Sequence, residues 1–267
     1  MKKIWYQSTL NFAQHPNYEK ALASHFDKVA SPGTKVLLNG RTTAYGNTLD
    51  TLDVIGSPIV YHSVVAPAFI RSLLTAESNG ADAFVVASFS EPILPELRSL
   101  ANIPVVSMSE ACFMAASMCA PKIGFVTLNR LVVPYIEKSI ALHKWKDRVT
   151  GIHLIEGDVS EAELDVSFAN PRPYLDRLVE GIRTAIAAGA QVIVPAEGVL
   201  GVMAAENGIR EIDGVPIIDA IGTPIIFAEM AIALKERTGV AQSRASYPSP
   251  SAEARELLSA NPSFQIR

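Results

Sequence analysis

The sequence predicts an α/β fold in which a lobe with a parallel sheet occurs twice. Short apolar runs alternate with segments of helical spacing along the whole chain, and this alternation is typical of α/β proteins. The apolar runs are continuous, as in strands of a parallel sheet that helices cover on both faces. A weak internal repeat then relates the first half of the chain to the second.

These patterns assign each element in order along the chain. The predicted strands are Lys3–Tyr6, Lys35–Leu38, Ala83–Ala87, Pro104–Ser107, Ile123–Thr127, Ile152–Ile155, Val192–Pro195 and Pro216–Ile218. The predicted helices are Tyr18–Ala30, Pro67–Ser78, Glu110–Met118, Val132–His143, Pro173–Ala188, Thr223–Lys235 and, in a tail rich in Ser and Pro, Ser251–Ser259.

Four strands of the first half recur in the same order in the second half. GADAFVVAS matches GAQVIVPAE, TKVLLNG matches TGIHLIEG, KIWYQ matches KIGFV, and IPVVS matches VPIID. Four matches at nearly constant spacing indicate a duplicated lobe. The first match places Ser88 and Glu197 at equivalent positions, one and two residues after the ends of equivalent strands.

The repeat also predicts where a ligand binds. In open parallel sheets, ligands bind outside the carboxyl ends of the strands, and two equivalent lobes would turn these ends toward each other across one cleft. We therefore expect Ser88 and Glu197 to approach a bound molecule from opposite sides. Other polar residues at predicted strand ends are Gln7, Ser8, Thr127, Asn129 and Asp219.

Composition disfavours several classes of protein. The chain has 267 residues, of which 49% are hydrophobic and 19% charged, enough to build a core. Its net charge of −4 and the lack of any basic run argue against a nucleic-acid partner. No apolar run is long enough for a membrane span, and Ile4–Tyr6 is too short for the core of a signal peptide. We expect a cytoplasmic protein that acts on a small molecule.

Familiar catalytic and cofactor motifs are missing from the sequence. GxSxG, GxxxxGK[ST], GxGxxG and HExxH do not occur, and the five histidines are scattered. Cys112 and Cys119 lie about 10 Å apart along one predicted helix, too far to bridge each other. The sequence therefore implies no metal, no cofactor and no disulfide framework.

Several phrases resemble the aspartate/glutamate racemase superfamily, most closely its hydantoin-racemase-like branch. They are NGADAFVVASFSEP, IPVVSMSEA, KIGFVT, AGAQVIVPAEGVLG and GVPIIDAIG, which span roughly residues 1–235 in the family order. The resemblance implies two Rossmann-like lobes with a cofactor-free site between them, in a homo-oligomer. The first lobe would comprise residues 1–107 plus 217–267, with a C-terminal arm, and the second residues 108–216.

Both cysteines that serve as proton carriers in that superfamily are replaced in this chain. The resemblance places the first at Ser88 and the second at Glu197, so thiol-based racemisation is not expected. A carboxylate is about 4 pKa units less basic than a thiolate, but desolvation in a closed cleft raises its pKa. We predict one-base chemistry with Glu197 as general base or acid and Ser88 as hydrogen-bond donor or nucleophile. Alternatively, Ser88 is only a turn residue and Glu197 only favours the next helix N-terminus.

Six further residues are predicted to bind the substrate, namely Thr127, Asn129, Gln7, Ser8, His62 and Phe89. The family's matching segment implies that Thr127 and Asn129 hold a carboxylate or carbonyl, while Asn129 also suits a helix N-cap. His62 precedes the helix expected at Pro67, where it could reach the cleft as a proton carrier or simply lie in a surface loop.

The predicted function is cofactor-independent acid–base chemistry next to the carbonyl of a small carboxylate, hydantoin or cyclic amide. The outcome would be racemisation, isomerisation, or protonation on one face after carbon–carbon cleavage, as in a lyase. The missing cysteine pair favours the last two. One alternative is a hydrolase of a small amide or imide, in which Glu197 activates water or Ser88. A second alternative is a small-ligand-binding protein without catalysis.

Overall fold

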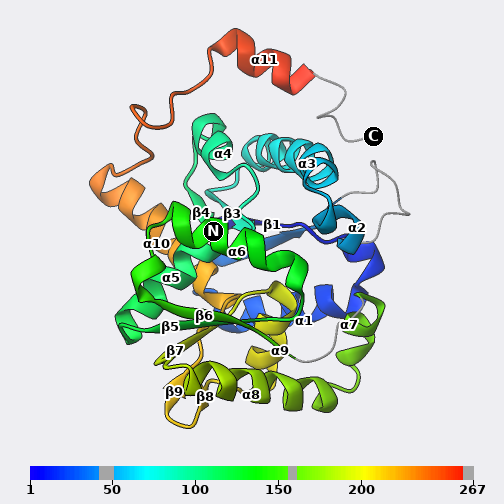
Figure 1. Cartoon of the computed structure of the whole chain (residues 1–267). Helices are drawn as coiled ribbons and strands as arrows, with labels where there is room; N and C mark the ends of the chain where they lie inside the picture. The colour runs from blue at the N-terminus through cyan, green and yellow to red at the C-terminus, as the bar shows by residue number, and fades with distance from the viewer. Residues whose placement is uncertain (42–50, 156–160, 261–267) are drawn as a thin grey trace.

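Two parallel sheets form the framework of the molecule (Figure 1). The computed structural model describes residues 1–41, 51–155 and 161–260. The first sheet contains β1 (Lys2–Ser8), β2 (Thr34–Asn39), β3 (Ala83–Ala87) and β4 (Val105–Ser107), in the order β2-β1-β3-β4. The second contains β5 (Ile123–Thr127), β6 (Val149–Leu154) and β7 (Val192–Pro195), in the order β6-β5-β7. The predicted α/β class with parallel sheets is confirmed.

The two sheets repeat one topology. In the first, β1 lies between β2 and β3, with Ile4 opposite Val36 on one side and Ala83 on the other. In the second, β5 lies in the same way between β6 and β7. These are the strands that the sequence repeat pairs, so the repeat corresponds to a real spatial equivalence.

The fourth strand of the second sheet differs from the prediction. The sequence predicts a parallel strand over Pro216–Ile218, but β9 (Val215–Pro216) pairs antiparallel with β8 (Glu211–Ile212). Beyond β9, Ile217 forms an isolated parallel bridge to Ile193 of β7, and the N–H of Ile218 donates to the Ile193 carbonyl at 2.8 Å. The cause is the turn Asp213–Gly214, where both residues have positive φ, as a tight hairpin requires.

Alternate residues of each strand enter two different cores. In β1, Tyr6 packs into the core between the two sheets, which also takes Phe125 from β5. Trp5 points to the opposite face of the first sheet, where Phe84 of β3 packs with it. Ile193 of β7 belongs to a third core, on the outer face of the second sheet. Burial on both faces explains why the strands read as continuous apolar runs.

Helices fill three layers around the sheets (Figure 1). α3 and α4 cover the outer face of the first sheet, and α8 covers the outer face of the second. α1, α5 and α10 contribute to the core between the sheets. The helices are α1 (Pro16–Val29), α2 (Thr51–Gly56), α3 (Pro58–Ser78), α4 (Leu94–Leu100), α5 (Met108–Cys119), α6 (Val133–Leu142), α7 (Glu161–Ser167), α8 (Arg172–Ala187), α9 (Gly198–Glu206), α10 (Gly222–Thr238) and α11 (Ala252–Ala260).

The chain passes between the sheets at two points. α5 follows β4 directly and packs against β7, and its N-cap is Ser107, whose hydroxyl accepts the Glu110 N–H at 3.2 Å. α10 then returns the chain to β3 and β4 of the first sheet. Asp219 caps α10 by accepting the N–H of Gly222 at 2.8 Å. The proposed lobe limits at residues 107 and 216 stay a prediction.

Helix α3 starts earlier than the sequence pattern predicts. It begins at Pro58, a favoured first position, and continues through Pro67, the predicted start. With 21 residues, α3 is long and apolar enough to cross a membrane by length and composition. Half of its apolar window is nevertheless buried against the rest of the chain, as expected for a core helix.

The tail after Gly239 packs on the C-terminal end of α4. Arg244 donates hydrogen bonds to the carbonyls of Arg98 and Ser99, both at 3.1 Å, and Arg255 donates to the carbonyl of Leu100. Cations are favourable at a helix C-terminus, where carbonyls lack intrahelical partners. The two arginines therefore bind the tail to the first lobe.

Candidate functional site

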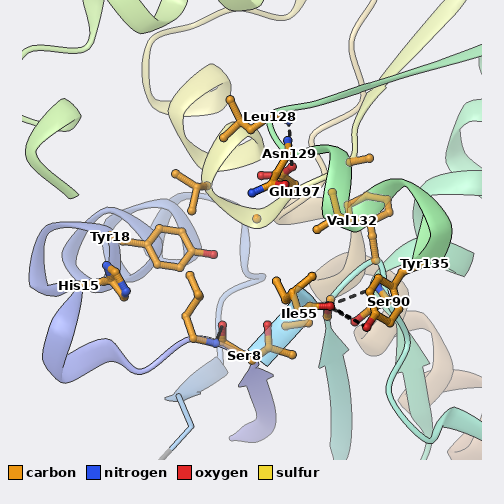
Figure 2. A pocket seen from close by; sticks show the side chains of 18 of the residues that line it. Ser8, His15, Tyr18, Ile55, Ser90, Leu128, Asn129, Val132, Tyr135 and Glu197 are labelled. Atoms are coloured by element: carbon orange, nitrogen blue, oxygen red, sulfur yellow. Dashed lines mark hydrogen bonds between the residues drawn. The ribbon is translucent and has the colours of Figure 1, made fainter. Parts of the chain in front are cut away.

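One pocket lies where the carboxyl ends of four strands meet. Ser8 ends β1 and Ser88 follows β3 in the first sheet, whereas Asn129 follows β5 and Glu197 follows β7 in the second. All four line the same cavity, whose volume is about 120 Å³. Figure 2 shows Ser8 on one side of it and Asn129 and Glu197 on the opposite side. The strand ends thus converge as the repeat predicted.

The carboxyl group of Glu197 is fixed through one of its two oxygens. Oε1 accepts the N–H of Leu128 at 2.9 Å, the N–H of Asn129 at 3.3 Å and the hydroxyl of Thr127. Glu197 occupies the N-cap of α9 in an extended conformation, and its side chain makes no cap hydrogen bond with α9. Among the described contacts, all hydrogen bonds go to Oε1. Oε2 is therefore the oxygen available to a pocket occupant.

Burial makes this carboxyl group more basic than usual. Desolvation raises the pKa of Glu197 above its ordinary value, although the hydrogen bonds from Thr127, Leu128 and Asn129 pull the pKa down. The raised pKa shows that desolvation outweighs the three donors. A fixed, partly buried carboxylate with a raised pKa is suited to general base catalysis.

Ser88 belongs to a row of hydroxyl groups. Its Oγ lies 2.7 Å from the Oγ of Ser90 and accepts the N–H of Ser90 at 3.3 Å. Ser90 in turn is hydrogen-bonded to the phenol of Tyr61 on α3. Figure 2 shows Ser90 beside Tyr135, on the side of the cavity away from Glu197.

Three of the predicted substrate-binding residues line the cavity, namely Ser8, Phe89 and Asn129. Asn129 also caps the short 3-10 helix Arg130–Val132, because its Oδ1 accepts the N–H of Leu131 at 2.8 Å. Both roles considered for Asn129 are therefore compatible with its position.

Thr127, Gln7 and His62 do not line the cavity, which corrects their placement. Thr127 lies behind Glu197 and donates its hydroxyl to it. Gln7 points to the opposite face of the first sheet, because side chains alternate along β1, and it accepts a hydrogen bond from Ser72. His62 is exposed on α3, since that helix starts before it.

Several lining residues escape the sequence pattern because they come from helices rather than strand ends. Tyr18 lies on α1, Tyr61 on α3 and Tyr135 on α6, while Asp165 comes from α7 and His15 precedes α1. Asp165 accepts the N–H groups of Asn17 and Tyr18 at the start of α1. The sequence repeat relates strands only, so it contains no signal for the way helices close the cavity.

Tyr18 requires a glycine at position 198. A Cβ atom there would lie 2.4 Å from the Tyr18 hydroxyl oxygen, and Tyr18 is buried at 3% exposure, so its ring cannot move aside freely. We expect Gly198→Ala to lower the unfolding free energy by about 1–3 kcal/mol, the usual cost of overpacking. Thermal unfolding measures this. The double variant Gly198→Ala/Tyr18→Phe should recover most of the loss, and an unrelieved double variant would contradict the clash.

A buried carboxylate anchors the loop that carries Ser88. Glu91 follows this loop at a φ of 47° and accepts hydrogen bonds from Ser139 at 2.6 Å, from His143 at 2.8 Å and from Ser107. Ser139 lies on α6 and His143 directly follows that helix. Because α6 also lines the cavity, Glu91 fixes two of its walls relative to each other.

The pairing with Glu91 makes His143 more basic. Burial alone lowers the pKa of His143, but the hydrogen bond and charge of Glu91 and the charge of Glu110 outweigh burial and the opposing charge of Arg98, so the pKa is raised. A raised histidine pKa contributes stability that is complete below about pH 6.5, the unfolded value, and is lost as the pH rises through the folded pKa.

We therefore expect the Tm of the wild-type protein to exceed that of His143→Gln by less and less as the pH increases from 6 to 9. The measurement is the difference in Tm between the two proteins at each pH. Taking the difference removes the titration of other groups, which both proteins share. A difference that stays constant or grows with pH would contradict the ion pair.

The charges around the cavity are acidic. Among the described lining residues, Asp165 and Glu197 carry carboxylates, and none is a lysine or arginine. Within the described ranges, no group of three His, Cys, Asp or Glu side chains is placed to hold a metal ion. The arrangement offers one base, a row of hydroxyls and aromatic walls.

Comparison with known proteins gives consistent matches. The family model for Asp/Glu/hydantoin racemases matches residues 48–223. A hydantoin racemase from Pseudomonas sp. (strain NS671) is 28% identical over 173 residues, which cover 64% of this chain and 67% of that protein. An allantoin racemase structure from Klebsiella pneumoniae superposes with a TM-score of 0.76 at 20% identity, covering 98% of this chain and all of that one.

A second allantoin racemase structure, from Pseudomonas fluorescens, has a TM-score of 0.72 at 21% identity and covers 93% of this chain and 97% of its own. These structures share the fold with its two lobes, and the family model covers well over half of this sequence. The resemblance noted from the strand-end phrases is therefore confirmed. The chain belongs to the Asp/Glu/hydantoin racemase family, whose members are racemase-like enzymes.

Proposed function

We propose that this protein moves the proton on the carbon next to a carbonyl of a small neutral cyclic amide of the hydantoin class. Glu197 would act as the base, and no cofactor would take part. The observation that carries the proposal is the Glu197 carboxyl group, which is held through Oε1 by three donors and raised in pKa by burial. The family membership supports racemase-like chemistry.

The proposed reaction balances in two steps. Oε2 of Glu197 takes the proton from the ring carbon, and the electron pair of that C–H bond moves into the neighbouring carbonyl to give an enolate. The Ser88 hydroxyl, across the cavity, donates a hydrogen bond to the developing oxygen charge. For inversion, a water on the face opposite Glu197 gives its proton to the carbon, the enolate collapses to the carbonyl, and the hydroxide left behind takes the proton from the Glu197 carboxylic acid. Return of the proton from Glu197 itself on the same face restores the starting enantiomer.

The charge of the pocket favours a neutral substrate over a dicarboxylate. Asp165 and Glu197 both line the cavity, with no lysine or arginine among its described lining residues. The backbone N–H groups of Leu128 and Asn129, which would suit a substrate carboxylate, already bind Glu197. The names of the similar hydantoin and allantoin racemases also favour the hydantoin class.

The size and walls of the pocket suit one flat ring. Its volume of about 120 Å³ is close to that of a cavity that holds a benzene molecule, about 150 Å³. Tyr18 and Phe168 lie with ring centroids 6.0 Å apart, and Tyr61 and Tyr135 with centroids 5.0 Å apart. These rings offer flat apolar contact surfaces to a planar heterocycle.

Proton NMR in deuterated water tests the proposal. The protein is incubated with enantiopure 5-methylhydantoin, allantoin, a substituted malonate, maleate and succinimide. We expect deuterium to enter C5 of the hydantoins while the ring stays intact, with parallel loss of optical rotation. Products of a broken C–C or C–N bond would instead indicate a lyase or hydrolase, and ligand-induced stabilisation without turnover would indicate a binding protein.

A further inference from the structure

A chain of three hydroxyl groups leads from helix α3 to the pocket. The Tyr61 phenol contacts Ser90 Oγ, and Ser90 Oγ lies 2.7 Å from Ser88 Oγ. Tyr61 is buried and packs with its ring against Tyr135, which in turn donates its hydroxyl to the Ile55 carbonyl at 3.0 Å. The starting point of the chain is therefore held by packing rather than by solvent.

The donor strength of the phenol sets the direction in which the hydrogen bonds of these three hydroxyl groups run. Burial raises the pKa of Tyr61, so the phenol keeps its proton at neutral pH. A phenol is more acidic than an alcohol and is the better donor, so Tyr61 donates to Ser90. Ser90 can then donate its own proton to Ser88, whose Oγ also accepts the Ser90 N–H at 3.3 Å.

The hydroxyl proton of Ser88 is not used in the bonds with Ser90. A serine hydroxyl has two acceptor lone pairs and one proton, and Ser90 fills both lone pairs. Besides Ser90, the Ser88 hydroxyl interacts with the Tyr61 phenol among its described contacts, and Ser88 lines the cavity, so its O–H can turn toward a molecule bound there. Hydrogen bonds that run in one direction also polarise one another, which strengthens the last donor.

We propose that Tyr61 and Ser90 are positioning residues that aim the Ser88 hydroxyl proton into the pocket, toward the oxygen charge that forms opposite Glu197. This inference rests on the proposed function for its catalytic meaning. It explains how an uncharged serine can act at a position where the chain offers no ionisable group: a fixed donor needs no reorganisation when charge develops.

A double-mutant cycle on 5-methylhydantoin exchange tests the inference. We expect Ser88→Ala to lower kcat about 100-fold, the scale for one lost oxyanion donor. Tyr61→Phe and Ser90→Ala, which leave Ser88 present but unaimed, should each lower kcat about tenfold with KM little changed. Tyr61→Phe added to Ser88→Ala should cost nothing more, because both act through one proton.

Tyr247→Phe is the matched control, since it removes a phenol that lies on the tail beside Arg98 and away from the cavity. Unchanged kcat in Tyr61→Phe, or losses that simply add in the double variant, would overturn the inference while leaving the proposed function intact. Absence of exchange by the wild type would instead reject the proposed function.

In that case the hydroxyl chain itself is judged by thermal unfolding of the same variants. The loss in Tm caused by Tyr61→Phe should shrink when Ser90 is already alanine. Equal losses in both backgrounds would show that the three hydroxyls are not coupled, and would overturn the orientation as well.

Discussion

We expect Glu197→Gln to slow exchange at the ring carbon of 5-methylhydantoin about a thousandfold, within the range that a general base contributes. Glutamine keeps the shape of the side chain, and its carbonyl can still accept the bonds from Thr127, Leu128 and Asn129. It cannot take a proton. The measurement is the rate of deuterium incorporation by NMR.

The pH dependence of the wild type gives a second view of the same group. The rate should fall as the pH drops through the Glu197 pKa, and that pKa should lie above the ordinary glutamate value because burial raises it. Glu206→Gln, an equivalent change at the other end of α9, is the control and should keep the wild-type rate. If Glu197→Gln retained the wild-type rate, Glu197 would not be the base.

The Glu197→Gln substitution should not lower the Tm of the protein. Ionised Glu197 is held in the folded protein against a raised pKa, so folding is disfavoured by its charge at neutral pH. Replacing it with a neutral amide removes this penalty. A Tm equal to or above that of the wild type would therefore separate loss of the base from loss of the fold.

The second large effect concerns stability. We expect Glu91→Ala to lower the unfolding free energy by about 3 kcal/mol, because it leaves His143, Ser107 and Ser139 without their buried acceptor. The side chains of Glu91 and His143 are only 3% and 11% exposed, so water cannot replace the bonds fully. In a chain of this length the loss corresponds to a Tm lower by roughly 10 °C.

Glu96→Ala is the control for this change. Glu96 lies in the first turn of α4, a few residues after Glu91, and is exposed. Its loss should cost at most about 0.5 kcal/mol, as for most surface substitutions. Equal unfolding temperatures for the two variants would show that the Glu91 network contributes nothing.

The fold is largely predictable because its strands are local patterns. β3, β5 and β7 have the predicted bounds, since each is a buried apolar run with clear ends. α4 and α9 escape prediction: α4 has seven residues, and α9 is apolar all round, so neither shows a one-sided stripe. The predicted start of α3 is wrong because the internal Pro67 resembles a helix boundary.

The site is predictable only where it depends on strand ends. The repeat identifies Ser88 and Glu197 because it pairs their positions, and both line the cavity. The prediction for Gln7 is wrong because neighbouring side chains on a strand point to opposite faces. Ser8 lines the cavity, whereas Gln7 points to the other face and contacts Ser72. Tyr18 and Tyr61 reach the site, and Glu91 supports its walls, through packing between distant segments. No local pattern in the sequence encodes such contacts.

The core between the two sheets determines how the protein unfolds. It joins Tyr6 of the first sheet, Phe125 of the second and Ile225 of α10 in one continuous apolar cluster. Neither repeat encloses this cluster alone, so residues 108–216 cut out as a fragment would expose their part of it to water. The two repeats are consequently one cooperative unit, and we expect a single calorimetric transition for the whole chain.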